Sequence, residues 1–131
     1  MSTVNKKILH KQLLLELESW NRCLDYMQSE IVMLKNRMVH ILKDLTEKKM
    51  LALLEHYQNN FIEIDKSIVL FRHDIATQTM ILRKNHETEM EILLEKMGRQ
   101  KKLRKEIRMA ENLFIKLSES FNRSFTDKLV S

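Results

Sequence analysis

The sequence contains no proline and a single glycine, Gly98, among its 131 residues. Both residue types are unfavourable inside helices, and both supply the backbone angles that tight turns require. Their scarcity argues against strand-and-turn architectures and predicts long helices joined by few connections. One glycine also cannot build a phosphate-binding loop or a dinucleotide fingerprint. With so few turns there is little loop on which to assemble a catalytic pocket, so we expect a protein that is not an enzyme.

Cysteine and long apolar runs are equally scarce. Cys23 is the one cysteine, so no disulfide within the chain can form, which fits a reducing compartment. The longest apolar runs, such as residues 50–54, are far shorter than the roughly 18 residues of a membrane span. The N-terminus lacks the order of a signal peptide. We therefore expect a soluble cytoplasmic protein.

Two hydrophobic ladders with alternating steps of four and three residues dominate what the sequence does contain. Such steps keep apolar side chains on one seam of a helix, at the period of coiled coils. Nineteen of the twenty ladder positions are apolar or aromatic. The first ladder is Leu13, Leu17, Trp20, Leu24, Met27, Ile31, Leu34, Met38, Ile41 and Leu45. The second is Met50, Leu54, Tyr57, Phe61, Ile64, Ile68, Phe71, Ile75, Gln78 and Leu82.

The two ladders cannot face one partner from a single straight helix, because their seams lie roughly 110° apart. A turn at residues 46–49 solves this, since reflection about that point brings every seam residue opposite another. A rival turn at residues 58–60 contains asparagines, but it would interrupt an intact ladder. The central layers of the hairpin are then Trp20, Leu24, Ile31, Phe61, Ile68 and Phe71.

Gly98 marks the second predicted turn, because glycine commonly follows the last residue of a helix. A third seam then begins at Leu103 in a new phase and includes Ile107, Phe114 and Phe121. The sequence thus predicts helices at about 4–46, 49–97 and 100–128. We expect an all-α, antiparallel up-down-up three-helix bundle with coiled-coil-like packing, forming one domain over residues 1–131.

Several apolar residues lie outside the two seams, and a hairpin alone would leave them in water. A third helix or a second subunit would bury some of them. The predicted third helix is shorter than the second, so the turn end of the hairpin is expected to remain uncovered as a partner surface. The off-seam residues are Leu14, Val32, Val39, Leu53, Ile62 and Val69.

Basic residues concentrate after Gly98, where residues 99–131 carry nine basic and four acidic groups. Lys101, Arg104, Lys105 and Arg108 share one helical face and form a candidate anion-binding stripe for nucleic acid. The alternative is a structural role, in which the glutamates of residues 87–95 neutralise the stripe from across the predicted turn. No aromatic residue interrupts the stripe.

Metal ligands are present without a familiar spacing. The five histidines form neither the Glu-x-x-His pairs of di-iron bundles nor a zinc helix, so no metal or cofactor is predicted. One polar stripe on the second helix is a candidate ligand set, but a solvated surface is the preferred interpretation. It comprises His56, Asn60, Glu63, Ser67 and Asp74.

Residues 55–62, followed by residues 71–75, resemble stretches in small uncharacterised helical proteins of bacteria. The resemblance implies a continuous helix there and no particular activity, ligand or partner. The leading hypothesis is therefore a structural or protein-interaction module that presents helix faces to a partner protein or to a second copy. The alternative hypothesis is a basic helical module that binds nucleic acid or another polyanion through residues 99–108.

Overall fold

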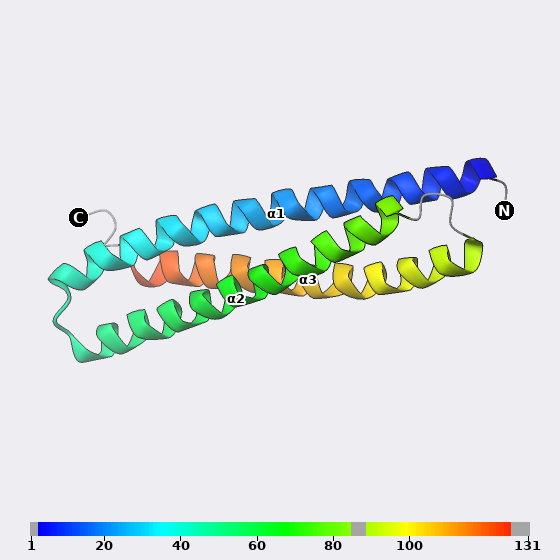
Figure 1. The fold of residues 1–131 in the computed structure, drawn as a ribbon. Coiled ribbons are helices and arrows are strands. Elements are labelled where there is room, and N and C mark those ends of the chain that lie inside the picture. Colours follow the sequence, from blue (N-terminus) through cyan, green and yellow to red (C-terminus); the bar gives the residue numbers. More distant parts are fainter. Residues whose placement is uncertain (1–2, 85–88, 127–131) are drawn as a thin grey trace.

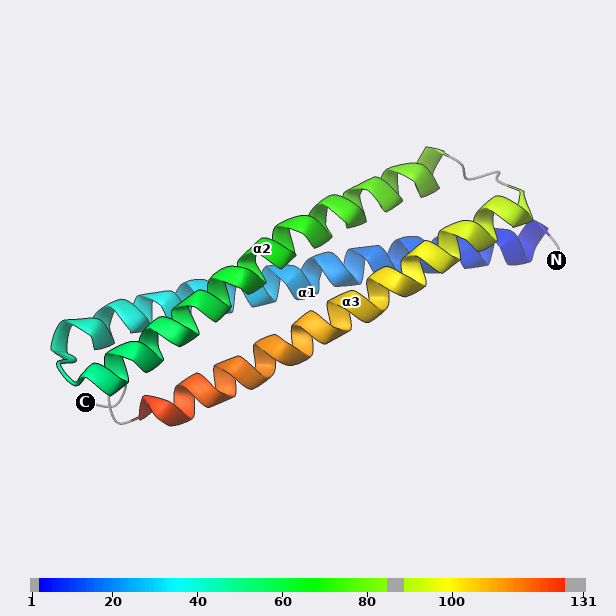
Figure 2. The same cartoon turned by 90° about the horizontal axis from the view of Figure 1, so that it is seen from below.

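The computed structural model describes residues 3–84 and 89–126, which form three α-helices in up-down-up order (Figure 1, Figure 2). Helix α1 is Thr3–Asp44, α2 is Lys48–Lys84 and α3 is Met90–Ser124. Each helix packs against both others. The predicted all-α three-helix bundle is confirmed.

The first connection lies at residues 45–47, beside the predicted turn. The carbonyl of Glu47 accepts a hydrogen bond from the backbone N–H of Leu51 at 3.0 Å, which begins α2. Residues 58–60, the rival turn, lie inside α2. The intact ladder therefore outweighs the turn preference of the asparagines.

The predicted second connection was wrong. Helix α2 ends at Lys84 and α3 begins at Met90, so the predicted ranges 49–97 and 100–128 misplace the boundary between them. Gly98 lies inside α3 on the exposed surface of that helix. A Cβ added at this position would have no atom within 4 Å. The physical reason is visible in the ladder, because its next two positions after Leu82 are the polar residues Asn85 and Glu89. The structure does not describe residues 85–88 and 127–131, on which part of the predicted second and third helices falls.

A buried glutamine explains why the third seam seemed to start afresh after Gly98. The seam of α3 runs without interruption through Leu93, Met97, Gln100, Leu103 and Ile107. Gln100 is fully buried at the position where an apolar residue would have revealed the continuity.

The core follows the ladders closely. All ten positions of the first ladder are buried, including Trp20. In the second ladder, Met50 and Phe71 are only partly buried, and the other eight positions are buried. Phe71 therefore lies at the margin of the core. The sequence pattern had placed it in the central layers, and that prediction was wrong.

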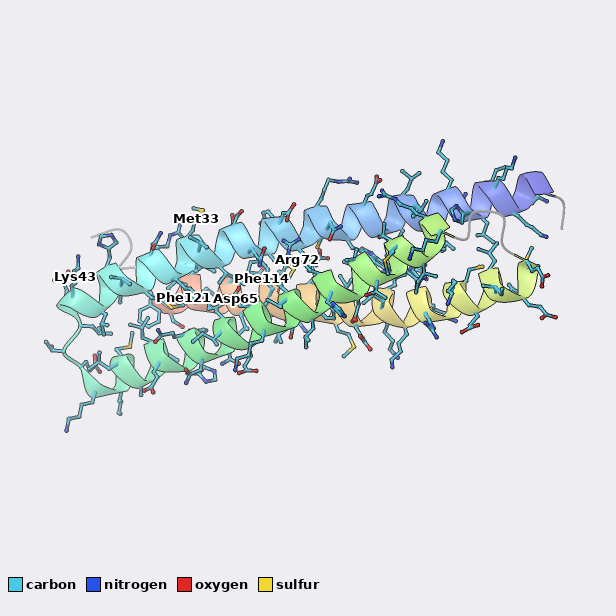
Figure 3. All side chains as sticks on the ribbon, viewed as in Figure 1. Met33, Lys43, Asp65, Arg72, Phe114 and Phe121 are labelled. Carbon is cyan, nitrogen blue, oxygen red and sulfur yellow. The ribbon has the colours of Figure 1, made fainter. Side chains whose placement is uncertain are left out.

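The half of the bundle nearer the first connection has an aromatic core. Phe61 contacts Phe114 and Phe121 edge to face, with ring centroids 6.4 Å apart in both cases. Tyr57 packs edge-on against Phe121 at 5.6 Å, and its hydroxyl is hydrogen-bonded to Ser120 of α3. Figure 3 shows Phe114 and Phe121 directed from α3 into the bundle. These contacts fix α3 against one side of the hairpin.

Candidate functional site

The two flanks of the α1 seam have different neighbours. On one flank, Glu16, Cys23 and Arg37 bond to residues of α3. On the other flank, Gln28 and Lys35 bond to residues of α2. Helix α3 therefore covers one face of the α1–α2 hairpin, and we call the opposite, uncovered face the open face.

Ion pairs between α1 and α2 cross the open face. Lys35 Nζ lies 2.5 Å from a carboxylate oxygen of Asp65. The Arg72 guanidinium donates hydrogen bonds to Asp25 and to the side-chain oxygen of Gln28, both at 2.6 Å. Figure 3 labels Asp65 and Arg72, one on each side of the middle of α2. These part-exposed pairs hold the hairpin register at modest energetic gain.

Aliphatic side chains on the open face remain in water. Of the six off-seam residues named above, Leu14 and Leu53 are partly buried against the core. The other four stay exposed, together with Leu42. Their exposed fractions are 57% for Val32, 56% for Val39, 55% for Leu42, 37% for Ile62 and 63% for Val69.

A shallow hollow marks the turn end of the open face. Val39 and Leu42 of α1 line it together with Leu51 and Ile62 of α2, and the core residues Met38 and Leu54 also border it. Helix α2 extends roughly 14 Å beyond the level of Tyr57, where Ser124 ends α3. Among the described residues, α3 thus covers the turn end of the hairpin less than the rest (Figure 2).

A buried polar layer joins all three helices in the half of the bundle farther from the first connection. Gln100 Nε2 donates to the Leu13 carbonyl at 2.9 Å and to Glu16 at 2.8 Å. Gln78 donates to the Lys96 carbonyl at 3.0 Å and to the Gln100 side-chain oxygen at 3.3 Å. This layer was not predicted from the sequence, although the spacing from Leu93 to Gln100 is a seam spacing. Such layers fix the register of packed helices, because a slip would bury unpaired polar groups.

Glu16 is the acidic centre of this layer. Burial raises its pKa, but hydrogen bonds from Arg104 and Gln100 and the positive charges of Arg104 and Arg108 lower it, and the net pKa is below the ordinary value. The guanidinium of Arg104 forms two hydrogen bonds of 2.7 Å with the two Glu16 oxygens. Arg104 is therefore a structural residue of the α1–α3 contact.

Cys23 lies on the same flank as Glu16. Its thiol donates to Glu111 Oε2 at 2.6 Å. Burial and the neighbouring Glu111 carboxylate raise the pKa of the Cys23 thiol to about 12. A thiol with so little thiolate is a poor nucleophile, so Cys23 has a packing role.

The structure divides the predicted anion-binding stripe. Arg104 turns toward Glu16, whereas Lys101, Lys105 and Arg108 are exposed on α3. The proposed neutralisation across a turn does not occur among the described glutamates, because Glu91 and Glu95 lie on α3 itself.

The polar stripe of α2 is largely occupied by contacts within that helix. Asn60 donates to the His56 carbonyl at 2.8 Å, and Ser67 donates to the Glu63 carbonyl at 3.2 Å. Glu63 also pairs with Lys66. Within residues 3–84 and 89–126, no group of three potential ligands has a geometry that would hold a metal ion.

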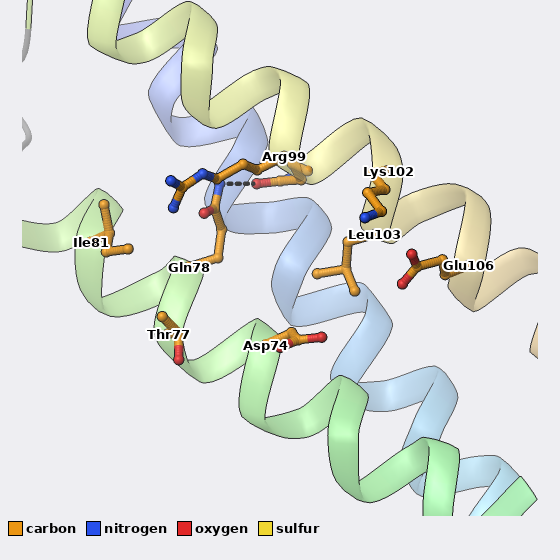
Figure 4. A pocket seen from close by; sticks show the side chains of 9 residues that line it. Asp74, Thr77, Gln78, Ile81, Arg99, Lys102, Leu103 and Glu106 are labelled. Atoms are coloured by element: carbon orange, nitrogen blue, oxygen red, sulfur yellow. Dashed lines mark hydrogen bonds between the residues drawn. The ribbon is translucent and has the colours of Figure 1, made fainter.

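The remaining member of that stripe, Asp74, lines a hollow of about 230 Å³ between α2 and α3. Figure 4 shows Asp74 on α2 directed toward Lys102 and Glu106 on α3, beside the hydrogen bond between Gln78 and Gln100. The charged groups are of both signs and border an open space. This arrangement is typical of a solvated surface hollow.

None of the described helices is long and apolar enough to cross a membrane. No family model matches the sequence, and neither characterised proteins nor solved structures give a match. The bacterial resemblance of residues 55–75 stays a prediction.

Proposed function

We propose that this chain is a non-catalytic interaction module that binds a second copy of itself through the open face. One observation carries the proposal: five aliphatic side chains remain exposed on the open face, because α3 packs on the opposite face of the hairpin. Exposed aliphatic patches of this kind are typical of interaction surfaces. The module needs no cofactor, and its free cysteine fits the predicted cytoplasmic location.

The charge of the open face favours a second copy as the occupant. The ion pairs and hollows of this face contain four cations and four carboxylates, a balance of charge that the whole chain, at +5, does not have. A neutral face can approach its own copy without repulsion. The cations are Lys35, Arg72, Arg83 and Lys84, and the carboxylates are Glu18, Asp25, Glu55 and Asp65.

The size of the open face also fits a dimer. The 37 residues of α2 are about 55 Å long, and two adjacent helices are about 20 Å wide. The resulting footprint of about 1,000 Å² is comparable to the roughly 800 Å² that each partner buries in a standard interface.

A two-fold axis near Lys35 and Asp65 gives a self-complementary arrangement. The exposed aliphatic residues of the open face form two halves, one with Val32 and Val69 and one with Val39 and Ile62. The two-fold axis would place the first half of each copy against the second half of the other. Such an isologous contact closes after two copies and leaves no free binding surface.

Light scattering across a wide range of concentrations tests the proposal. The wild-type chain should approach twice its 15.8 kDa mass as the concentration rises. Val39→Glu and Ile62→Glu should remain at one chain mass, because a carboxylate would be buried without a partner in the contact. Glutamate is a good helix former, so these variants should retain their helical circular dichroism.

Met109→Glu is the matched control, since Met109 is 64% exposed on α3. It should dimerise like the wild type. A wild-type mass that stays at one chain at every concentration would exclude a second copy as the occupant. Loss of dimer in the Met109 variant alone would place the interface on α3.

A further inference from the structure

A row of exposed cations runs along α3, from Lys102 at the edge of the hollow beside α2 to the side that faces away from the hairpin. Six exposed basic side chains lie between residues 101 and 123, against two exposed carboxylates, Glu106 and Glu119. This outer face of α3 therefore contributes +4 to a chain whose total charge is +5. The six cations are Lys101, Lys102, Lys105, Arg108, Lys116 and Arg123.

The cations of the outer face are not held in ion pairs with any described residue. None of the six forms an ion pair in the part of the chain that the structure describes, whereas Lys35 and Arg72 on the hairpin are both paired. Two other cations of α3 do have carboxylate partners: Arg99 pairs with Glu95, and Arg104 pairs with Glu16. The outer face thus presents a row of positive charges that no ion pair among the described residues neutralises.

We propose that the outer face of α3 binds the phosphate backbone of double-stranded nucleic acid. Neutralised phosphates release their condensed counterions, and this release drives sequence-independent binding to a row of cations. The proposal is independent of dimer formation, because the outer face and the open face lie on opposite sides of the bundle.

The side chains around the cations favour a duplex over other polyanions. Single-stranded nucleic acid is usually bound by exposed aromatic rings on which bases stack. The aromatic residues of α3, Phe114 and Phe121, are both buried. A membrane-surface helix needs an apolar face free to insert into lipid, but the main apolar seam of α3 is packed against α1 and α2.

The length of the row also suits a duplex. Residues 101 and 123 are about 33 Å apart along the helix, close to the length of one turn of B-DNA. The first four cations occupy a stretch of about 10 Å along the helix axis. This density of charge makes residues 101–108 the centre of the contact.

Fluorescence anisotropy of a labelled DNA duplex, titrated with the full chain at several salt concentrations, tests the proposal. Four phosphate contacts predict a slope of log K against log salt of about −3.6, or roughly a hundredfold loss of affinity from 50 to 200 mM salt. The triple variant Lys101→Gln, Lys105→Gln, Arg108→Gln should reduce the slope to about −0.9. Its helical circular dichroism should remain that of the wild type.

A control variant with the same change of net charge distinguishes a local site from general attraction. Arg22→Gln, Lys43→Gln, Lys49→Gln removes three exposed cations that lie outside α3 and outside the ion pairs and hollows of the open face, and it should keep the wild-type slope. An equal loss in both triple variants would overturn the site. Binding that is stronger to a single strand or to phosphatidylserine vesicles than to the duplex would overturn the assignment to a duplex, as would a slope near zero.

Discussion

Replacement of Gly98 by alanine should stabilise the protein, although glycine is often irreplaceable where it ends a helix. Gly98 lies inside α3, has no positive φ angle, and leaves open space where a Cβ would be added. Alanine therefore meets no steric obstacle there. Glycine in a helix interior costs about 0.8–1.0 kcal/mol relative to alanine, so Gly98→Ala should increase the free energy of unfolding by about that amount.

The expected change in melting temperature follows from the size of the chain. At about 2.1 cal/mol/K per residue, 131 residues give an unfolding entropy near 275 cal/mol/K. A gain of about 1 kcal/mol then raises the melting temperature by about 3–4 °C. Thermal unfolding followed by circular dichroism at fixed protein concentration would measure it.

The reverse substitution at an exposed helical alanine is the matched control. Ala52→Gly in α2 should lower the melting temperature by a similar amount. An unchanged or lower melting temperature for Gly98→Ala, beside a normal response at Ala52, would show that Gly98 is not in a helix. The turn at Gly98 that the sequence suggested would then be restored.

Three further predictions concern the core and the α1–α3 contact. The pKa of Glu16 is lowered in the fold, so its carboxylate stabilises the protein above the unfolded-state pKa. This stabilisation is lost as the pH falls through the folded-state pKa. The free energy of unfolding of Glu16→Gln should therefore depend less steeply on acid pH than that of the wild type. Glu111→Gln should lower the pKa of the Cys23 thiol from about 12, so the Cys23 thiol should react faster with iodoacetamide at alkaline pH. Leu24→Ala should cost about 2–5 kcal/mol in urea unfolding, and Phe71→Ala should cost less than other core phenylalanines, since it is only partly buried. Unchanged acid unfolding, unchanged thiol reactivity, no loss at Leu24, or a cost at Phe71 equal to that of Phe61→Ala would contradict the respective explanation.

The hairpin could be predicted from the sequence because its seams are apolar throughout. All ten positions of the first ladder are buried, and a polar residue interrupts the second ladder only at Gln78. A strict pattern of this kind specifies one face of each helix, and the change of phase between the ladders located the first connection. Local preferences, such as the asparagines at 59 and 60, were too weak to compete.

The third helix was harder to predict because its seam contains polar residues that are satisfied by tertiary contacts. Gln100, Arg104 and Glu111 all lie on the α1 side of α3, and each bonds to a residue far away in the sequence. A sequence pattern cannot distinguish such residues from solvent-exposed ones. Because these polar residues interrupt the apolar pattern, the sequence predicted that one helix ends and another begins there. The presence of Gly98 favoured the same prediction.

The same limitation applies to the candidate site. The sequence placed Arg104 in the anion-binding stripe, because spacing alone does not reveal that Glu16 lies 2.7 Å away. The exposure of Val32, Val39, Ile62 and Val69 could be suspected from their off-seam positions. Which of them α3 would cover depended on the side of the hairpin that it packs against, and no local pattern specifies that side.

The position of α3 along α1 is the claim on which the open face, the polar layer and the outer face all depend. Arg37 Nη1 lies 3.4 Å from Asn122 Oδ1, so cysteines at these two positions should be joined by a short bismaleimide within one chain. A connection at Gly98 would instead displace the third helix along α1 by roughly 20–30 Å.

The measurement is therefore the cross-linking yield of Arg37→Cys, Asn122→Cys in a Cys23→Ala background, read from the monomer band on a denaturing gel. The arrangement of the three helices predicts a high yield for this pair. It predicts none for Ser19→Cys, Asn122→Cys, whose positions are about 27 Å apart along the bundle. Efficient cross-linking of residue 122 to residue 19 but not to residue 37 would contradict the arrangement of the three helices.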